Sequence, residues 1–341
     1  MAGPTCFFIP PHITDHIARN AQRRGEGANA VRAAMADQAL RQQRKSATYA
    51  TLQTLTPPQP GKSDIAIYDD QNQWVVNVQL VRGPDDPPVG SANVNRAYDA
   101  LAATRKFYHD VLGRESIDNA GLTIDGNVNF GVQYDNAFWD GSEMVFGNGD
   151  DTIFKDFTND VDVPGHELTH GVTQYTAGLG YTDQTGALNE ATSDIMGACI
   201  DQYVSGQDAG TFNWLIGEGV MADDLYGEAI RSMAHPGTAY DDPLLGKDPQ
   251  ADSMAGYVPN GDPHVNSGII NRVFYLIATD LGSFPAAKLW YATLQNLWPT
   301  AVFADAAHVC GDMARILARD GVVARQAPQT VRAAFHEVGI S

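Results

Sequence analysis

The sequence is poor in cysteine and in positive charge, and it has no long apolar run. Its three cysteines, Cys6, Cys199 and Cys310, allow at most one disulfide bond, which excludes a fold held by several such bonds. Lysine and arginine number 22 against 41 aspartate and glutamate residues, a formal net charge of −19 at pH 7. This excess of negative charge argues against nucleic acid or an anionic membrane surface as a partner.

No apolar stretch approaches the roughly 20 residues that a membrane-spanning helix needs. Residues 1–11 also lack the basic region and long apolar run of a secretory signal peptide. A hydrophobic content of 43% with 18% charged residues is ordinary for a globular protein, and 341 residues are enough for two domains.

The most informative motif is the H-E-x-x-H pattern at residues 166–170, within a stretch predicted to be helical. Positions four apart lie on one face of a helix, so His166 and His170 can bind one metal ion together. Glu167 can then act as a base on a water bound to that ion. Taken alone, the pattern is also compatible with two surface histidines beside a solvated glutamate.

A second helical segment supplies the groups that the first one lacks. Glu190 can be the third ligand of a zinc ion, which in hydrolases takes three protein ligands and keeps one position open for water. Asp194 and Asn189 can accept hydrogen bonds from the free ring nitrogens of the two histidines, which fixes their tautomers. Two helices thus supply three ligands, a base and the groups that orient the ligands.

With these residues, the sequence resembles the thermolysin-type zinc metallopeptidases. Three further blocks, at residues 136–139, 231–233 and 264–271, agree with that family in the same order. The resemblance covers about residues 60 to 341. The short N-terminal segment with Ile9-Pro10-Pro11 is similar to the protealysin-type branch, whose propeptides are short.

The resemblance implies an α+β, thermolysin-like fold of two domains with the zinc site in the cleft between them. We expect a propeptide at residues 1–48, a β-rich domain at 49–178 ending in the zinc helix, and a mainly helical domain at 179–341. The spacing of apolar residues along the chain agrees with this division into a β-rich and a helical part. This spacing predicts strands at 64–68, 74–80, 127–134 and 143–146, and helices at 93–112, 190–204, 268–281, 286–297, 304–319 and 328–338.

The resemblance also implies a neutral zinc endopeptidase with one catalytic Zn²⁺. Glu167 is expected to take a proton from a zinc-bound water and pass it to the leaving nitrogen. Tyr181 and His264 are expected to hydrogen-bond the developing oxyanion, and Arg231 a substrate carbonyl. Asp262 is the nearby acidic residue that could orient His264.

Peptides and proteins are the expected substrates. Asn136 and the backbone of Ala137 and Trp139 are expected to hold a substrate as an added strand. The family resemblance also implies an apolar pocket beside the zinc, and hence cleavage on the N-terminal side of bulky hydrophobic residues. Its expected lining residues are Phe154, Phe157, Val163, Ile216 and Ile230.

A calcium site is a further expectation of the resemblance. Asp162, Asp201, Asn213 and Glu218 fall at positions where the family has oxygen ligands, and Ca²⁺ prefers several such oxygens. Leu215 stands where a second carboxylate is expected, so one ion is predicted rather than a pair. The alternative is a solvated acidic surface.

The N-terminal segment is basic, whereas the rest of the chain is acidic. Residues 12–46 predict two short helices, which dock by charge complementarity or present a solvated face. With the resemblance, we expect the segment to cover the cleft until it is cut near residues 45–52. Cys6 packs in this segment or caps the zinc through its thiolate; both remain open.

Two other functions are compatible with the same residues: a zinc hydrolase that acts on other amides, and a catalytically silent zinc-bearing binding protein. A latent zymogen that needs another protease is a further alternative. The chain is expected to be a monomer, either retained in a bacterial cell or secreted by a route without a classical signal peptide.

Overall fold

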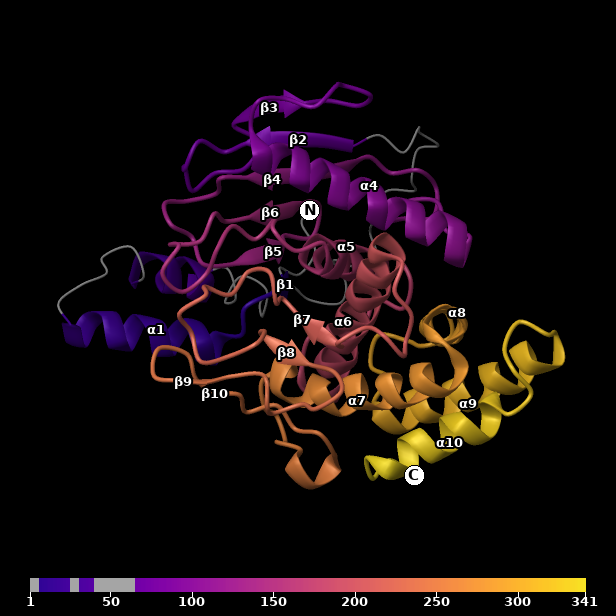
Figure 1. Ribbon diagram of the computed structural model, residues 1–341. Coiled ribbons are helices and arrows are strands. Elements are labelled where there is room, and N and C mark those ends of the chain that lie inside the picture. Colours follow the sequence, from indigo (N-terminus) through magenta and orange to yellow (C-terminus); the bar gives the residue numbers. More distant parts are fainter. Residues whose placement is uncertain (1–5, 25–30, 40–64) are drawn as a thin grey trace.

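The computed structural model describes residues 6–24, 31–39 and 65–341. From residue 65, the first half of the chain carries most of a six-stranded sheet with helix α4 (Ala92–Leu112) beside it, and the second half is mainly helical (Figure 1). The β-rich and helical parts therefore follow one another along the chain, which confirms the predicted α+β class.

The sheet has the strand order β1-β5-β6-β4-β2-β3 and mixes parallel with antiparallel pairs. β2, β4 and β6 run parallel, β5 is antiparallel to β6, and the N-terminal β1 is antiparallel to β5. A segment from the start of the chain thus covers the edge that β5 would otherwise expose. The strands are β1 (Cys6–Phe7), β2 (Ile65–Asp69), β3 (Gln79–Arg82), β4 (Ile124–Val128), β5 (Ala137–Trp139) and β6 (Met144–Phe146).

Helices α5 and α6 lie between the sheet and helices α7 to α10 (Figure 1). Two short antiparallel ladders, β7 (Leu215–Ile216) with β8 (Arg231–Ser232) and β9 (Asp241–Asp242) with β10 (Gly246–Lys247), lie in the connection between α6 and α7. The helices are α5 (Asp162–Gln174), α6 (Asp183–Ser205), α7 (Pro263–Leu281), α8 (Ser283–Leu294), α9 (Phe303–Arg319) and α10 (Ala327–Glu337), with a 3₁₀ turn at Met254–Gly256.

Glycines allow α5 and α6 to cross closely. A Cβ at Gly165 would lie 3.0 Å from Ile200 Cδ1 and 3.4 Å from Gly197 Cα, and one at Gly197 would lie 2.9 Å from the Asp162 carbonyl oxygen. The two backbones can approach this far because neither glycine has a side chain. Pro164 lies in the first turn of α5, where its missing N–H breaks no helical hydrogen bond.

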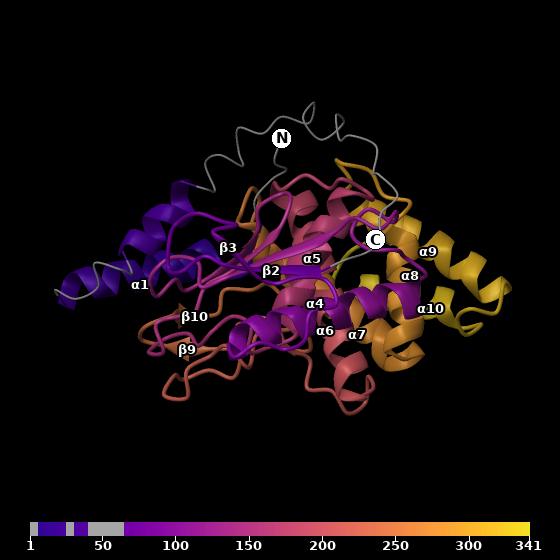
Figure 2. The ribbon, with the colours of Figure 1, turned by 90° about the horizontal axis from the view of Figure 1, so that it is seen from above.

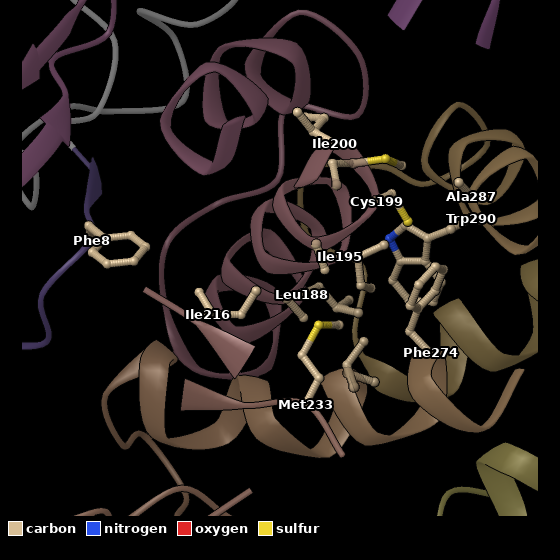
Figure 3. Close-up of a cluster of buried hydrophobic side chains, with 14 of the residues drawn as sticks. Phe8, Leu188, Ile195, Cys199, Ile200, Ile216, Met233, Phe274, Ala287 and Trp290 are labelled. Carbon is tan, nitrogen blue, oxygen red and sulfur yellow. The ribbon is translucent and has the colours of Figure 1, made fainter. Parts of the chain in front are cut away.

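The helical core is built around α6, in which every residue from Thr185 to Ile200 is buried. Figure 3 shows Ile195 and Cys199 of this helix facing Phe274 and Trp290 of the neighbouring helices. Cys6, Cys199 and Cys310 are all buried, as expected for small hydrophobic side chains. This packing fixes α6 and, with it, Glu190 in the N-terminal half of that helix.

The N-terminal segment packs against the rest of the chain as a strand and two helices. Helix α1 (Pro11–Arg24) lies beside β9 and β10, at the opposite end of the molecule from α9 and α10 (Figures 1 and 2). His16 Nε2 lies 3.1 Å from the Pro243 carbonyl oxygen, to which the Asn20 amide also donates. A second helix spans residues 31–39.

The strand predicted at residues 74–80 is largely wrong. Bends occupy most of this stretch, and β3 begins only at Gln79. Gln71, Asn72 and Asn77 have positive φ angles of 53°, 58° and 61°, a left-handed conformation that interrupts an extended strand. The strand predicted at 127–134 is also misplaced, because β4 spans Ile124–Val128. Across the described ranges, no helix combines the length and apolar character required to cross a membrane.

Candidate active site

Three metal-donor side chains converge between α5 and α6. The donor atoms of His166, His170 and Glu190 all lie within 4.8 Å of one another, and all three residues are buried. The two Nε2 atoms are 3.0 Å apart, and Glu190 Oε2 lies 3.4 Å from His166 Nε2. Two imidazole nitrogens and one carboxylate are the donor set of a catalytic zinc site that leaves one position open.

Hydrogen bonds on the other ring nitrogens orient both histidines. His166 Nδ1 lies 2.9 Å from Asp194 Oδ1, and His170 Nδ1 lies 2.8 Å from Asn189 Oδ1. Each Nδ1 therefore donates to an oxygen and leaves Nε2 directed at the metal position. Both contacts are those predicted from the spacing in the sequence.

The electrostatics of the cluster suit a cation. Burial alone would lower the pKa of His166, but hydrogen bonds to Asp194 and Glu190 raise it to about 9. Burial alone would raise the pKa of Glu190, but the imidazoles of His264, His170 and His166 lower it to about 2. The site therefore stabilises positive charge at its centre, and the residues present fit a zinc ion.

Glu167 is buried beside these ligands, and neither of its carboxylate oxygens has a hydrogen-bond partner among the described residues. Burial, aided by the charge on Glu190 and opposed by His166, raises its pKa to about 8. An unsatisfied buried carboxylate is costly and needs a functional reason. A base that accepts a proton from water supplies one.

Tyr181 and His264 face the same centre from the opposite side. The Tyr181 hydroxyl donates to Glu190 Oε1 and lies 3.4 Å from His264 Nε2. His264 Nδ1 lies 2.7 Å from Asp262 Oδ1, so Asp262 reaches the ring and orients it. The same carboxylate caps α7 by accepting from the His264 backbone N–H.

The aromatic ring of Phe8 is buried where the apolar pocket is predicted. This ring lies edge-on to His166 and Phe157, with centroid separations of 5.3 and 6.4 Å, and Figure 3 shows it directed toward the helical core on the side of Ile216. A Cβ at Gly217 would lie 2.9 Å from the ring. The predicted lining residues Phe154, Phe157, Val163, Ile216 and Ile230 are all buried in the cluster that contains Phe8.

Main-chain contacts hold the N-terminal segment along β5. Cys6 pairs with Trp139 and Phe7 with Phe138, and the Phe8 N–H donates to the Ala137 carbonyl oxygen at 3.0 Å. These contacts continue the sheet by one short strand. Asn136, predicted to bind substrate, accepts from the Ile9 N–H through Oδ1 at 2.8 Å.

Arg231 and His264 contact the same segment. The Arg231 Nη1 group donates to the Phe8 carbonyl oxygen at 2.9 Å, and His264 Nε2 lies 2.7 Å from the Phe7 carbonyl oxygen. Arg231 is held by Asp194, to which its Nε and Nη2 groups both donate. Asp194 therefore connects the metal ligand His166 to the peptide-binding Arg231.

One functional contact was not predicted. Asp37, in the helix at residues 31–39, is buried, accepts a hydrogen bond from the Tyr134 hydroxyl, and accepts another from the Asn136 side-chain amide at 2.8 Å. No sequence signal separates Asp37 from the other acidic residues of the chain. Only the folded structure brings it to Asn136, which is 99 positions away.

The four residues of the calcium prediction lie near one another. Asp162 Oδ1 is buried without a partner, and burial together with the charges of Asp160 and Glu218 raises the pKa of Asp201 to about 6. The Asn213 amide donates to Glu218 at 2.7 Å. Asp160, which the sequence analysis missed, joins the group and accepts from the Gly219 N–H.

Cys6 lines a small cavity next to the metal ligand His170, between Trp139 and Leu179. It is buried and belongs to the main hydrophobic cluster. The packing interpretation of this residue therefore has structural support.

Comparison with known proteins identifies the class to which this fold and site belong. The family model described as the thermolysin metallopeptidase catalytic domain matches residues 30–174, and the model of the thermolysin metallopeptidase α-helical domain matches residues 177–340. The chain belongs to the thermolysin family of metallopeptidases, and it is a zinc metalloendopeptidase.

Individual relatives agree with this assignment. An extracellular metalloprotease of Pectobacterium carotovorum is 42% identical over 306 residues, covering 85% of this chain and 84% of the relative. Thermolysin of Alicyclobacillus acidocaldarius is 36% identical over 297 residues, which cover 82% of this chain and 51% of the relative. The precursor of protealysin, a metalloproteinase from Serratia proteamaculans, has a similar structure, with a TM-score of 0.84, 38% identity and coverage of 98% of this chain and 100% of that one.

Proposed function

We propose that the chain is the precursor of a zinc endopeptidase that cuts peptides on the N-terminal side of bulky hydrophobic residues. The observation that carries this proposal is Phe8, whose ring fills the apolar pocket beside His166 while its backbone pairs with β5. Complete burial of a phenylalanine side chain contributes about 1.5–3 kcal/mol, enough to select for large apolar residues at this position.

The residues around the pocket fit the roles that peptide hydrolysis requires. Zinc, when bound by His166, His170 and Glu190, supplies a Lewis acid that polarises the substrate carbonyl and lowers the pKa of the attacking water. Glu167 accepts the proton of that water and delivers it to the leaving nitrogen. Its buried, unpartnered carboxylate is available for both transfers.

Tyr181 and His264 stabilise the negative charge that develops on the carbonyl oxygen. Asp262 holds the His264 ring so that Nε2 points into the cleft. Hydrogen-bond donors of this kind are worth about 3–4 kcal/mol when they point at the transition-state oxygen. Arg231 binds the next carbonyl along the peptide, and Asp194 keeps its guanidinium in place.

We assign residues 1–48 to a propeptide that inhibits the enzyme, residues 49–178 to the β-rich domain and 179–341 to the helical domain. The inhibition is supported by the position of residues 6–9, which occupy the edge of β5 and the apolar pocket that a substrate needs. The expected maturation cut near residues 45–52 lies outside the described residues.

A single calcium ion held by Asp162, Asp201, Asn213 and Glu218 is part of the proposal. The buried, unpartnered Oδ1 of Asp162 supports it, because a cation would satisfy that oxygen. We also place the mature enzyme outside the cell as a monomer acting on proteins, since the Pectobacterium relative is named as an extracellular protease.

The proposal is tested with peptides that differ in one residue. The purified chain, treated with trypsin to remove the propeptide, should cut a peptide before Phe or Leu at least tenfold faster than one with Ala at that position. A zinc chelator should abolish cleavage and added zinc should restore it. Zinc binding without cleavage of any peptide would instead support the zinc-bearing binding protein.

A further inference from the structure

We propose that the precursor hydrolyses its own Phe7–Phe8 peptide bond, because the N-terminal segment lies in the cleft in the direction and register of a substrate. This inference rests on the proposed function and names one self-cleavage site for it. The site is distinct from the maturation cut expected near residues 45–52.

The Phe7 carbonyl lies where the reacting carbonyl of a substrate belongs. Its oxygen is 2.7 Å from His264 Nε2, and that nitrogen is 3.3 Å from the metal-donor oxygen Glu190 Oε2. A carbonyl oxygen only accepts hydrogen bonds, so His264 donates to it. The Phe7 carbonyl is therefore polarised by His264, the residue that we expect to stabilise the oxyanion. The same His264 nitrogen also lies close to the metal-donor residue Glu190.

The groups that follow this carbonyl are held just as firmly. The Phe8 N–H donates to the Ala137 carbonyl oxygen, the Arg231 guanidinium donates to the Phe8 carbonyl oxygen, and the Ile9 N–H donates to Asn136 Oδ1. Main-chain groups on both sides of the Phe7–Phe8 bond are thus fixed. Fixed reactants of this kind lower the barrier to reaction by proximity and orientation.

The side chains agree with the same register. Phe8, the residue after the bond, fills the apolar pocket beside His166. Phe7 points to the other face of the strand and packs on Phe138, with ring centroids 5.5 Å apart. The bond is followed by a bulky apolar residue, which is the preference proposed for external substrates.

The chain beyond the bond is preorganised and stays bound after the cut. Pro10 and Pro11 have restricted φ angles, and the Pro10 carbonyl oxygen accepts from the Ile13 N–H at the start of α1. The contacts of His16 and Asn20 with the Pro243 carbonyl hold α1 to the catalytic part. Cleavage at this bond therefore leaves the apolar pocket filled by Phe8.

The reaction consumes one water and no other reactant. The water oxygen bonds to the Phe7 carbonyl carbon, the C–N bond to Phe8 breaks, and its electron pair stays on nitrogen. Glu167 transfers one proton of the water to that nitrogen, and the second, left on the new Phe7 carboxyl group, passes to the same nitrogen. The products are a carboxylate on Phe7 and an ammonium on Phe8.

The experiment measures the intact mass and the N-terminal sequence of the full chain. Wild type purified with a chelator should start upstream of Phe8 and, after zinc is added, acquire a new N-terminus at Phe8. The first-order rate constant of this self-cleavage should not change when the protein is diluted tenfold, because each chain cuts the Phe7–Phe8 bond that lies in its own active site. Glu167→Ala with zinc should keep the original N-terminus.

Two matched variants test the register. Phe8→Leu keeps a bulky apolar residue in the pocket and should still be cut, whereas Phe8→Gly should slow the cut at least tenfold. Neither change is expected to lower cleavage of an added peptide once trypsin has removed the propeptide. Hydrogen exchange gives a readout without turnover: in zinc-loaded Glu167→Ala, the amides of Phe8 and Ile9 should be protected, and Phe8→Gly should remove that protection.

Each outcome decides the proposal. A wild-type chain that cuts added peptide after trypsin treatment but never acquires an N-terminus at Phe8 overturns the self-cleavage site and leaves the proposed function intact. Equal cutting of Phe8→Gly and Phe8→Leu also overturns the site. A chain that binds zinc and cuts neither itself nor any peptide overturns both.

Discussion

Asp37 and Asn136 lie 2.8 Å apart, with the Asn136 amide donating to the carboxylate. Asp37 belongs to the N-terminal segment, and Asn136 directly precedes β5, the strand with which that segment pairs. Asn136 also accepts from the Ile9 N–H, so one side chain is held by two different parts of the same segment. The segment thus occupies the substrate position and also secures a residue that would bind substrate.

Replacing Asp37 by Ala should therefore loosen the N-terminal segment. The change removes the buried carboxylate to which Tyr134 and Asn136 donate, a cost of about 1–3 kcal/mol. In a Glu167→Ala background, trypsin should remove the segment about 5- to 150-fold faster, as followed by gel electrophoresis. Asp15→Ala is the control, because Asp15 is exposed on the other helix of the segment. Equal rates for the two variants would contradict the role of Asp37.

Gly217 should control the size of the pocket. Its φ of 72° disfavours any side chain, and a Cβ would also lie 2.9 Å from both the Phe8 ring and Ile230. Gly217→Ala should reduce the preference for Phe over Ala after the cut about 10-fold or more in kcat/KM. Gly206→Ala is the matched control, since Gly206 has a φ of 70° and open space around it. Both variants should lose about 1 kcal/mol of stability, but only the first should change specificity.

Asn189 should contribute to zinc affinity without touching the ion. Its Oδ1 accepts from His170 Nδ1, and its amide donates to the Leu179 carbonyl oxygen. Asn189→Ala should weaken zinc binding about 10- to 100-fold, measured by competition with a chromogenic chelator in a Glu167→Ala background. Asn296→Ala, a change at an exposed amide, should leave the affinity unchanged. An unaltered zinc affinity of Asn189→Ala would show that packing alone orients the His170 ring.

The sequence predicts the metal centre well because its spacing is local. Positions 166 and 170 share one helix face, as do 190 and 194, and the histidine–carboxylate and histidine–amide contacts follow once the two helices cross. The second role of Asp262, as the cap of α7, could also have been predicted: an Asp before a Pro is a helix start signal, and α7 begins at Pro263 rather than at the expected residue 268.

The contacts that were missed connect distant positions. Asp37 and Asp160 acquire their roles only when separate segments pack together, and no periodicity in the sequence marks them. The misplaced strand near residue 77 has a related cause. Asn77 adopts a left-handed conformation and donates to Glu143, while its backbone N–H donates to Asn127, so tertiary hydrogen bonds outweigh local strand propensity there.

Asp70 should make stability depend on pH. It is buried with Oδ2 unpartnered, and burial, aided by the charges of Glu143 and Asp69, raises its pKa from 3.8 to about 7. The folded state then binds this proton more tightly than the unfolded chain. The contribution of Asp70 to stability should therefore be fully present below about pH 4, be lost as the pH rises to about 7, and stay absent above that.

Asp70→Asn removes this titration and should leave stability near pH 4 almost unchanged. At pH 8 it should raise the free energy of unfolding by about 2 kcal/mol, a value reduced from the full pKa shift to allow for the polar groups nearby. Denaturant unfolding of the Glu167→Ala chain at both pH values measures the difference. Asp85→Asn, at an exposed position, should show no such pH-dependent gain. A variant less stable than its parent at pH 8 would mean that the charged carboxylate is stabilising.

The most direct measurement follows cleavage of an unfolded protein by the trypsin-activated chain and maps the cut positions by mass spectrometry, with and without a zinc chelator. We expect cuts before Phe, Leu and other bulky apolar residues, their loss with chelator, their return with zinc, and no cuts by Glu167→Ala under any condition. Cleavage that survives the chelator or the Glu167→Ala change would contradict the zinc-dependent mechanism. Zinc bound by the trypsin-activated wild type without any cut would contradict the peptidase function itself.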